Sequence, residues 1–187
     1  MKRPAVFLDR DGTLVEEVGY LRRIDQIRII PEAIEAVRRI HALGSRAVVV
    51  TNQSGVARGL FDEAFVRTAH RRLAEIFAGG GAAIDAFYFC PHHPTEGRPP
   101  YRRTCACRKP APGMLLQASA ELDIDLSRSF VIGDTETDLE LAARAGATGI
   151  LVRTGYGRLL DPTGWKPACI AAHVLEAVQW IEQHQAP

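Results

Sequence analysis

Two acidic residues near the start of the chain are spaced for joint chemistry. Asp9 and Asp11 follow a short apolar run and stand two residues apart in a segment expected to be extended. The spacing does not fit a calcium-binding loop, because a loop starting at Asp9 would need Gly and Glu where the chain has Leu14 and Tyr20. The pair is therefore either part of a plain turn or a source of two carboxylates for a reaction.

A second acidic pair, Asp134 and Asp138, has the spacing of one helix turn. Acidic side chains at the start of a helix can simply stabilise the helix dipole, by about 0.3–1 kcal/mol each. Together with Asp9, these residues also supply the hard oxygen ligands that Mg²⁺ prefers. The two acidic pairs therefore predict a magnesium site.

Lys109 stands out in a chain that uses Arg for 20 of its 23 basic residues. A compact ammonium where Arg is the rule favours a specific role over a solvated side chain before Pro110. A second polar group follows the apolar run at 47–50, and it could form either a plain turn or a phosphate cradle of hydroxyl and backbone N–H groups. Its members are Thr51, Asn52, Gln53 and Ser54.

Three Cys and one His form the pattern Cys-x-His, twelve residues, Cys-x-Cys. Three thiolates and one imidazole match a closed structural zinc site. The alternative is two buried thiol pairs, for which a loop with four Pro between positions 91 and 100 offers little core. The predicted zinc ligands are Cys90, His92, Cys105 and Cys107. His93 is a rival to His92, and Cys169 is expected to lie in the core.

The chain alternates short apolar runs with helical patterns, which predicts a parallel sheet covered by helices on both faces. A length of 187 residues favours one domain over residues 1–187. The predicted strands are 5–8, 47–50, 86–89, 130–132 and 149–152. The predicted helices are at about 32–43, 62–78, 112–122, 136–145 and 173–184. Residues 13–30 are expected to form a hairpin or flap, and residues 90–110 a structured loop insertion.

The composition is that of an ordinary soluble protein, with 47 % hydrophobic and 24 % charged residues and a net charge of +1. This balance gives no electrostatic reason to expect a nucleic-acid or membrane-surface partner. No apolar run approaches the roughly 18 residues of a membrane span, and we do not expect the N-terminal residues to form a signal peptide, because charged residues follow after only a few apolar ones. We therefore expect a cytoplasmic protein, whose Cys are ligands or core residues rather than disulfides.

The carboxyl ends of the predicted strands carry these polar residues. Asp9 and Asp11 follow the first strand, Thr51 follows the second, and Asp134 follows the fourth. In open α/β sheets, ligands bind beyond these strand ends. The polar groups are therefore expected to converge on one site.

In this order, the motifs Asp-x-Asp-Gly-Thr, Thr51, Lys109 and Gly-Asp-x-x-x-Asp resemble those of the haloacid dehalogenase (HAD) superfamily of aspartyl phosphotransferases. The resemblance covers nearly the whole chain. It implies a three-layer, Rossmann-like α/β fold with a parallel sheet and no large cap domain. It also implies that Asp9 is the nucleophile, that Asp11 is the general acid and base, and that Thr51 and Lys109 bind the transferring phosphoryl group.

The same resemblance implies that Mg²⁺ is held by Asp9, Asp134 and the main-chain carbonyl of Asp11, with Asp138 behind them. The loop with Cys-Pro-His-His-Pro and Cys-x-Cys-Arg-Lys-Pro is similar to one subgroup, the heptose bisphosphate phosphatases and the related histidinol phosphatases. Its long gap between His92 and Cys105 resembles the heptose enzymes more. In that group, the residues at Gly19, Tyr20 and Arg108 contact substrate.

The resemblance implies Mg²⁺-dependent removal of the 7-phosphate from D-glycero-D-manno-heptose 1,7-bisphosphate through an aspartyl-phosphate. Such an enzyme would serve heptose synthesis for lipopolysaccharide or another glycan, with a small phosphorylated sugar as its partner, and we expect a monomer. Alternatives are histidinol-phosphate hydrolysis and a receiver-like signalling domain; a zinc-dependent nucleic-acid module is disfavoured by the near-neutral charge. Thr135 stands where family members often carry Lys, which leaves the anomer preference open.

Overall fold

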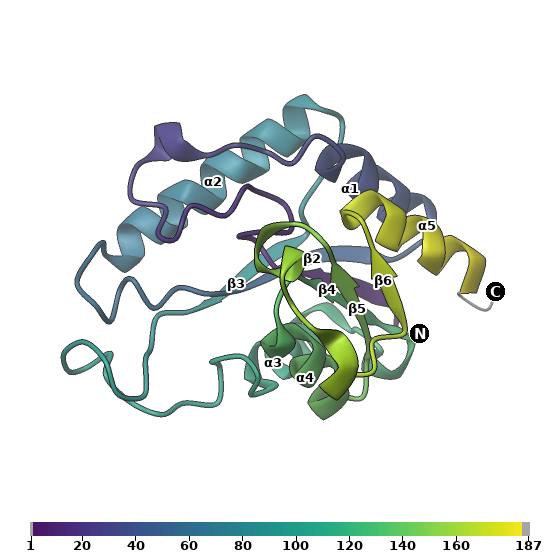
Figure 1. Ribbon diagram of the computed structural model, residues 1–187. Coiled ribbons are helices and arrows are strands. Elements are labelled where there is room, and N and C mark those ends of the chain that lie inside the picture. The colour runs from purple at the N-terminus through teal and green to yellow at the C-terminus, as the bar shows by residue number, and fades with distance from the viewer. Residues whose placement is uncertain (1, 185–187) are drawn as a thin grey trace.

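The computed structural model describes residues 2–184 and has one six-stranded sheet in which all strands are parallel (Figure 1). The strand order is β3-β2-β1-β4-β5-β6. The strands are β1 (Ala5–Leu8), β2 (Arg46–Asn52), β3 (Ala86–Cys90), β4 (Phe130–Gly133), β5 (Thr148–Val152) and β6 (Cys169–Ala171). The edge strand β6 was not predicted, because its three residues are too short an apolar run to be distinguished.

Helices cover both faces of this sheet. In Figure 1, α1, α2 and α5 lie on one face, and α3 and α4 lie on the other. The bounds are α1 (Ala33–Ala42), α2 (Glu63–Gly79), α3 (Gly113–Leu122), α4 (Glu136–Ala145) and α5 (Val174–His184). The three-layer α/β prediction is confirmed, and the predicted helices lie at their expected places.

Burial on both faces of the sheet explains why the strand sequences are continuously apolar. All four residues of β1 are fully buried, because the sheet is covered on both sides. Val6 and Leu8 pack into the core beneath α1, α2 and α5, whereas Phe7 packs into the core beneath α3 and α4. The period-two alternation of a strand thus feeds two separate cores from one run of sequence.

The segment between β1 and α1 contains no hairpin. It is an irregular loop with one 3-10 turn (Ile24–Gln26) and a single antiparallel bridge between Val15 and Ile29. Five of its apolar residues are buried in the main core, so they anchor the loop to the sheet rather than pairing as strands: Leu14, Val15, Leu21, Ile27 and Ile30. This arrangement corresponds to the flap alternative, and it adds no separate cap domain to the part of the chain described here.

The loop after β3 extends away from the sheet beside the loop after β2 (Figure 1). The two loops are joined where the N–H of Arg98 donates to the carbonyl of Ala57 at 3.2 Å. Gly97 has a φ of +88°, and a Cβ there would lie 1.9 Å from the Ala57 oxygen, so only glycine fits. The two loops therefore form one packed unit at the carboxyl end of the sheet.

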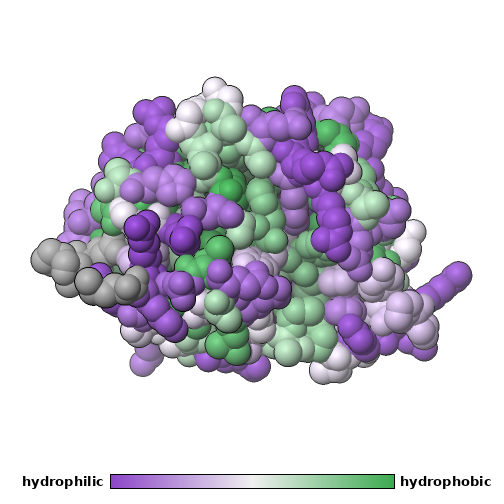
Figure 2. Space-filling model, turned by 180° about the vertical axis from the view of Figure 1, so that it is seen from behind, coloured by the Kyte–Doolittle hydropathy of each residue, from purple (hydrophilic) through white to green (hydrophobic). Residues whose placement is uncertain are grey.

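Hydrophilic and hydrophobic residues are interspersed on the face seen in Figure 2. The large hydrophobic side chains that are exposed come from different parts of the chain: Val18, Leu116, Tyr156, Leu159 and Ile170. Within residues 2–184, no helix combines the length and apolar character that a bilayer crossing requires.

Candidate active site

The residues predicted for catalysis and for phosphate and substrate binding converge on one pocket of about 290 Å³. The pocket opens at the carboxyl ends of β1, β2 and β4, beside the point where the strand order reverses between β1 and β4. Such a switch point is where open α/β sheets bind ligands. The predicted residues that line it are Asp9, Asp11, Gly19, Tyr20, Thr51, Asn52, Gln53, Ser54, Arg108, Lys109 and Asp134.

Lys109 lies at the centre of the acidic residues. Its ammonium is 2.7 Å from Asp9 Oδ1, 2.7 Å from Asp138 Oδ1 and 3.1 Å from the carbonyl of Val50. All three ammonium protons can therefore be donated to an acceptor. The side chain is buried, and the two carboxylates raise the pKa of Lys109 despite the opposing effect of burial. Lys109 is thus a fixed positive charge in contact with Asp9.

Asp9, Asp134 and Asp138 could hold a metal ion, since they offer oxygen atoms within 4.8 Å of one another. Burial and the neighbouring carboxylates raise the pKa of Asp9 to about 7, although Lys109 lowers it. Burial, with Asp9 and Asp138 nearby, raises the pKa of Asp134 to about 8. Both shifts have the same cause, burial beside other carboxylates, and a bound cation would favour the ionised forms.

One oxygen of Asp134 meets the requirement of a ligand atom. Oδ1 of Asp134 is buried and has no hydrogen-bond partner, while Oδ2 accepts from the N–H of Tyr156 at 2.7 Å. A buried carboxylate oxygen without a donor is costly unless a cation satisfies it. The free oxygen, the oxygen-only donor set and the raised pKa values together fit a hard divalent cation such as Mg²⁺.

Asp138 has both of its oxygens occupied. Oδ1 accepts from Lys109, and Oδ2 accepts from the N–H of Thr135 at 3.2 Å and from its hydroxyl at 2.6 Å. Thr135 is the N-cap of α4 and forms a capping box with Asp138. Asp138 therefore links the start of α4 to Lys109, behind the free oxygen of Asp134.

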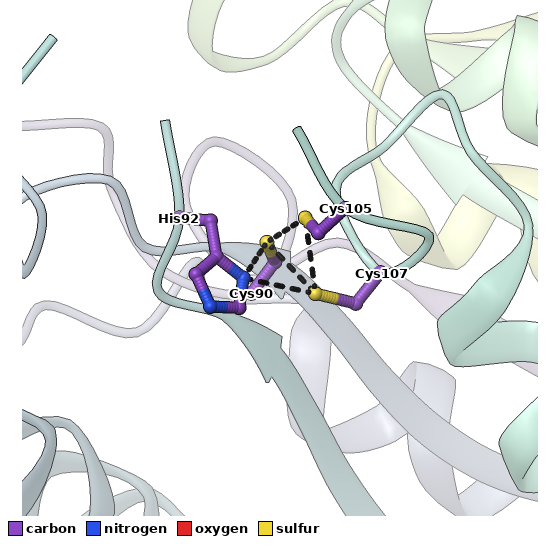
Figure 3. Close-up of side chains that lie close together, drawn as sticks. All are labelled: Cys90, His92, Cys105 and Cys107. Carbon is purple, nitrogen blue, oxygen red and sulfur yellow. Dashed lines mark hydrogen bonds between the residues drawn. The ribbon is translucent and has the colours of Figure 1, made fainter. Parts of the chain in front are cut away.

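Four further side chains, from the end of β3 and the loop that follows it, point toward one another (Figure 3). The Sγ atoms of Cys90, Cys105 and Cys107 lie 3.1–3.5 Å apart, and His92 Nδ1 lies 3.4 Å from Cys107 Sγ and 3.6 Å from Cys90 Sγ. The hydrogen bond with the Cys90 thiol lowers the pKa of Cys107 to about 5, against the effect of burial. The four atoms form a group that could hold one metal ion.

His93, the rival ligand, is turned away from this cluster. Its Nδ1 accepts from the backbone N–H groups of Thr95 and Glu96, at 3.3 and 2.9 Å. Cys169 lies in β6 and packs against the main core, as expected. The structure therefore places His92, and not His93, beside the three thiols.

Comparison with known proteins gives a consistent answer. The HAD-hydrolase-like family matches residues 106–177. The chain is 45 % identical to D-glycero-D-manno-heptose-1,7-bisphosphate 7-phosphatase of Thermosynechococcus vestitus, over 100 % of both chains. It is 46 % identical to the D-glycero-beta-D-manno-heptose-1,7-bisphosphate 7-phosphatase of Photorhabdus laumondii, over 81 % of each. The chain belongs to this family of HAD-like phosphatases.

A solved structure of another family member has the same fold. The D,D-heptose 1,7-bisphosphate phosphatase from B. bronchiseptica, complexed with magnesium and phosphate, matches 97 % of this chain and 99 % of its own. The TM-score is 0.85 at 33 % sequence identity. The resemblance inferred from the motifs is therefore confirmed, and this HAD phosphatase is an enzyme that hydrolyses phosphate monoesters.

Two buried residues of this HAD phosphatase were not singled out in the sequence. Arg10, between the two acids, contacts both oxygens of Asp11. His70, on α2, contacts Arg10 from the far side. Arg10 is visible in the Asp-Arg-Asp motif, but His70 is 60 residues away, on a helix face whose other residues are apolar.

Proposed function

We propose that the chain is a Mg²⁺-dependent phosphatase that removes the 7-phosphate of D-glycero-D-manno-heptose 1,7-bisphosphate. The observation that carries this proposal is the contact between Asp9 and the buried ammonium of Lys109, beside the unpartnered oxygen of Asp134. A carboxylate nucleophile needs such positive charge, because a phosphate dianion repels it. The full-length identity to the Thermosynechococcus enzyme supports this choice of substrate.

Asp9 is proposed as the nucleophile and Asp11 as the acid and base. In the first step, an oxygen of Asp9 attacks phosphorus while the bond from phosphorus to the sugar oxygen breaks. The departing oxygen takes a proton from Asp11. In the second step, Asp11 removes a proton from water as the water attacks phosphorus, and the bond to Asp9 breaks to release inorganic phosphate. Dividing one difficult displacement into two steps is the benefit of covalent catalysis.

The phosphoryl group is proposed to lie between Lys109 and Thr51. The Thr51 hydroxyl accepts from Gln53 Nε2 at 2.9 Å, so it can turn its own proton toward a phosphoryl oxygen. Lys109 would hold a second oxygen while keeping its contact with Asp138. Asn52 and Ser54 line the same wall, and Asn52 is turned toward the backbone of Lys109.

We propose that Asp9, Asp134 and the main-chain carbonyl of Asp11 hold the Mg²⁺, with Asp138 behind them. When bound, the ion would neutralise charge on the phosphoryl oxygens and on the crowded carboxylates. Asp138 is left in contact with Lys109 and Thr135, where it supports both.

The Cys and His cluster is proposed to hold a structural Zn²⁺. Ligands of a tetrahedral zinc ion lie about 2.0–2.3 Å from the metal, which places them roughly 3.5 Å from one another. The separations of 3.1–3.6 Å between these atoms fit that shell. Four protein ligands leave no open position for water, so this zinc would shape the loop that ends at Arg108 and Lys109.

The sugar is proposed to contact Gly19, Tyr20 and Arg108 at the mouth of the pocket. Gly19 and Tyr20 come from the flap, and Arg108 is fixed by its Nη1, which donates to the carbonyl of His92 at 3.1 Å. The whole unit is proposed to be one domain that acts as a monomer. Thr135 lines the same pocket, so it is a candidate for influencing the anomer that binds.

A phosphate-release assay tests the proposal. D-glycero-D-manno-heptose 1,7-bisphosphate should be hydrolysed with a kcat/KM at least about 100-fold above that for histidinol phosphate, because polar recognition discriminates strongly. Phosphorus NMR of the product should show that the 1-phosphate is retained. A preference for histidinol phosphate would transfer the assignment to that reaction. Slow turnover with a long-lived aspartyl-phosphate would favour the receiver-like alternative.

A further inference from the structure

Arg10 grips the carboxylate of Asp11 with one edge of its guanidinium. Nε lies 3.1 Å from both oxygens of Asp11, and Nη2 lies 3.0 and 2.8 Å from them. The Arg10 side chain is only 2 % exposed, so it cannot swing into solvent. A planar fork fixes the direction in which a carboxylate faces, which a lysine ammonium does not.

The remaining guanidinium nitrogen of Arg10 is held from behind by His70. Nη1 of Arg10 lies 3.4 Å from Nε2 of His70, which is on α2. The imidazole is itself held between two aromatic rings. It stacks on Phe87 with 4.7 Å between the ring centroids, and it packs edge-on against Phe89 with 5.7 Å between the centroids. His70 is therefore a rigid support for Arg10.

The contact between Arg10 Nη1 and His70 Nε2 is a hydrogen bond in which the guanidinium donates and the imidazole accepts. Burial and the nearby charges of Arg10 and Arg67 lower the pKa of His70 to about 3, so the ring is neutral. A neutral ring with its proton on Nδ1 presents a lone pair at Nε2, which accepts from the guanidinium. A charged imidazole would repel Arg10 instead.

His70 does not line the catalytic pocket. It borders a separate cavity of about 230 Å³ that Arg67, Arg71 and Phe87 also line. Any effect of His70 on the reaction must therefore pass through Arg10. Asp11 is held on its other side by Gln53, whose Nε2 donates to Oδ2 at 2.9 Å.

We infer that His70 and Arg10 are positioning residues that aim Asp11 for proton transfer with the substrate. The inference depends on the acid and base role assigned to Asp11 under the proposed function. A carboxylate that is turned away by a small angle loses its alignment with the leaving oxygen, and misplacement of about 1 Å can cost about 100-fold in rate. The effect of His70 and Arg10 on the rate should therefore be largest for substrates whose leaving oxygen needs a proton.

The test compares leaving groups. His70→Phe keeps the ring but removes the acceptor, so kcat/KM for an alkyl phosphate should fall about 10- to 100-fold, within the range of general acid catalysis. For p-nitrophenyl phosphate, whose leaving group departs without a proton, the fall should be less than about threefold. The comparison uses kcat/KM because it covers only the steps up to departure of the leaving group.

Three variants serve as controls. His70→Gln places an amide near Nε2 and should recover most of the lost rate with the alkyl phosphate. Arg67→Gln removes a side chain on the same helix that lies over Phe89 but does not contact Arg10 or Asp11, and it should leave both substrates unaffected. Should His70→Phe fail to fold, Arg10→Lys keeps the buried charge without the fork and is expected to show the same selective loss.

Equal losses with both substrates, or an unchanged rate in His70→Phe, would overturn the inference. Asp11→Asn, measured alongside, separates this failure from failure of the proposed function. If Asp11→Asn shows the selective loss and His70→Phe does not, only the positioning role is wrong. If Asp11→Asn also lacks it, the acid role of Asp11 fails and the inference fails with it.

Discussion

The side chain of Asn52 forms two hydrogen bonds with the main chain of Lys109. Its Nδ2 donates to the Lys109 carbonyl at 3.1 Å, and its Oδ1 accepts from the Lys109 N–H at 3.0 Å. Asn52 ends β2, so these two hydrogen bonds fasten the end of the loop after β3 directly to the sheet. Lys109 thus has two anchors, Asn52 on one side and the neighbouring cluster with Cys107 on the other.

Asn52 and the cluster with Cys107 both hold Lys109 in place, so each should partly compensate for the loss of the other. Asn52→Ala and Cys107→Ser are each expected to lower kcat/KM by about tenfold, because the other anchor still holds Lys109. The double variant should lose more than the product of the two single effects. Phosphate release from the heptose bisphosphate is measured for the parent, the two single variants and the double variant. Gln117→Ala, on the surface of α3, serves as a control that should leave the rate unchanged. Independent, multiplicative losses would show that the two contacts do not share Lys109.

Asp9→Asn should abolish turnover while the fold persists. The amide cannot form the covalent intermediate, so kcat is expected to fall by at least about 1000-fold, since the remaining site can only bind and polarise the phosphate. Single-turnover assays with a substrate that carries a radiolabel in its 7-phosphate should also find no labelled protein. A kcat within tenfold of the parent would remove Asp9 from the nucleophile role.

The metal-free protein should lose stability as pH rises from about 4 to 8. The pKa values of Asp9 and Asp134 are raised to about 7 and 8, so the folded state binds more protons than the unfolded state in this range. Mg²⁺ binds the ionised carboxylates, so it should raise Tm more at pH 8 than at pH 5. Thermal melts with and without MgCl₂ measure this difference.

Asp134→Asn provides the matched control for that experiment. The variant relieves crowding at Asp9 and removes the unpartnered ligand oxygen, so it should be more stable than the parent at pH 8 without metal, and Mg²⁺ should no longer raise its Tm. An equal effect of Mg²⁺ on both proteins would place the ion elsewhere.

The two adjacent histidines allow a direct test of the loop metal. His92→Ala should lower the zinc that copurifies from about one ion per chain to well below that, because it removes one of four ligands. His93→Ala should keep its zinc, since Nδ1 of His93 accepts from the backbone N–H groups of Thr95 and Glu96 instead of facing the three thiols. Elemental analysis of the two proteins measures the content. Equal zinc in both would contradict the choice of His92.

The polar residues at the strand ends could be predicted because their positions follow from local patterns. Asp9, Thr51 and Asp134 each follow a buried apolar run, and parallel strands bring such ends together. The role of His70 could not be predicted, because it depends on a contact with Arg10, which is 60 residues away in the sequence. The flap was also ambiguous, since apolar residues such as Leu14 and Leu21 are spaced alike whether they pair as strands or anchor a loop.

The packing of Gly97 against Ala57 ties the loop after β3 to the loop after β2, and Arg58 lies 3.7 Å from Glu96 across the same junction. Because the two loops fit together at this junction, a change in one of them constrains the other. Transplanting the loop after β3 from a relative with another sugar preference should therefore fail when it is exchanged alone. It should succeed when residues 53–62 travel with it, because the acids at the strand ends belong to neither graft.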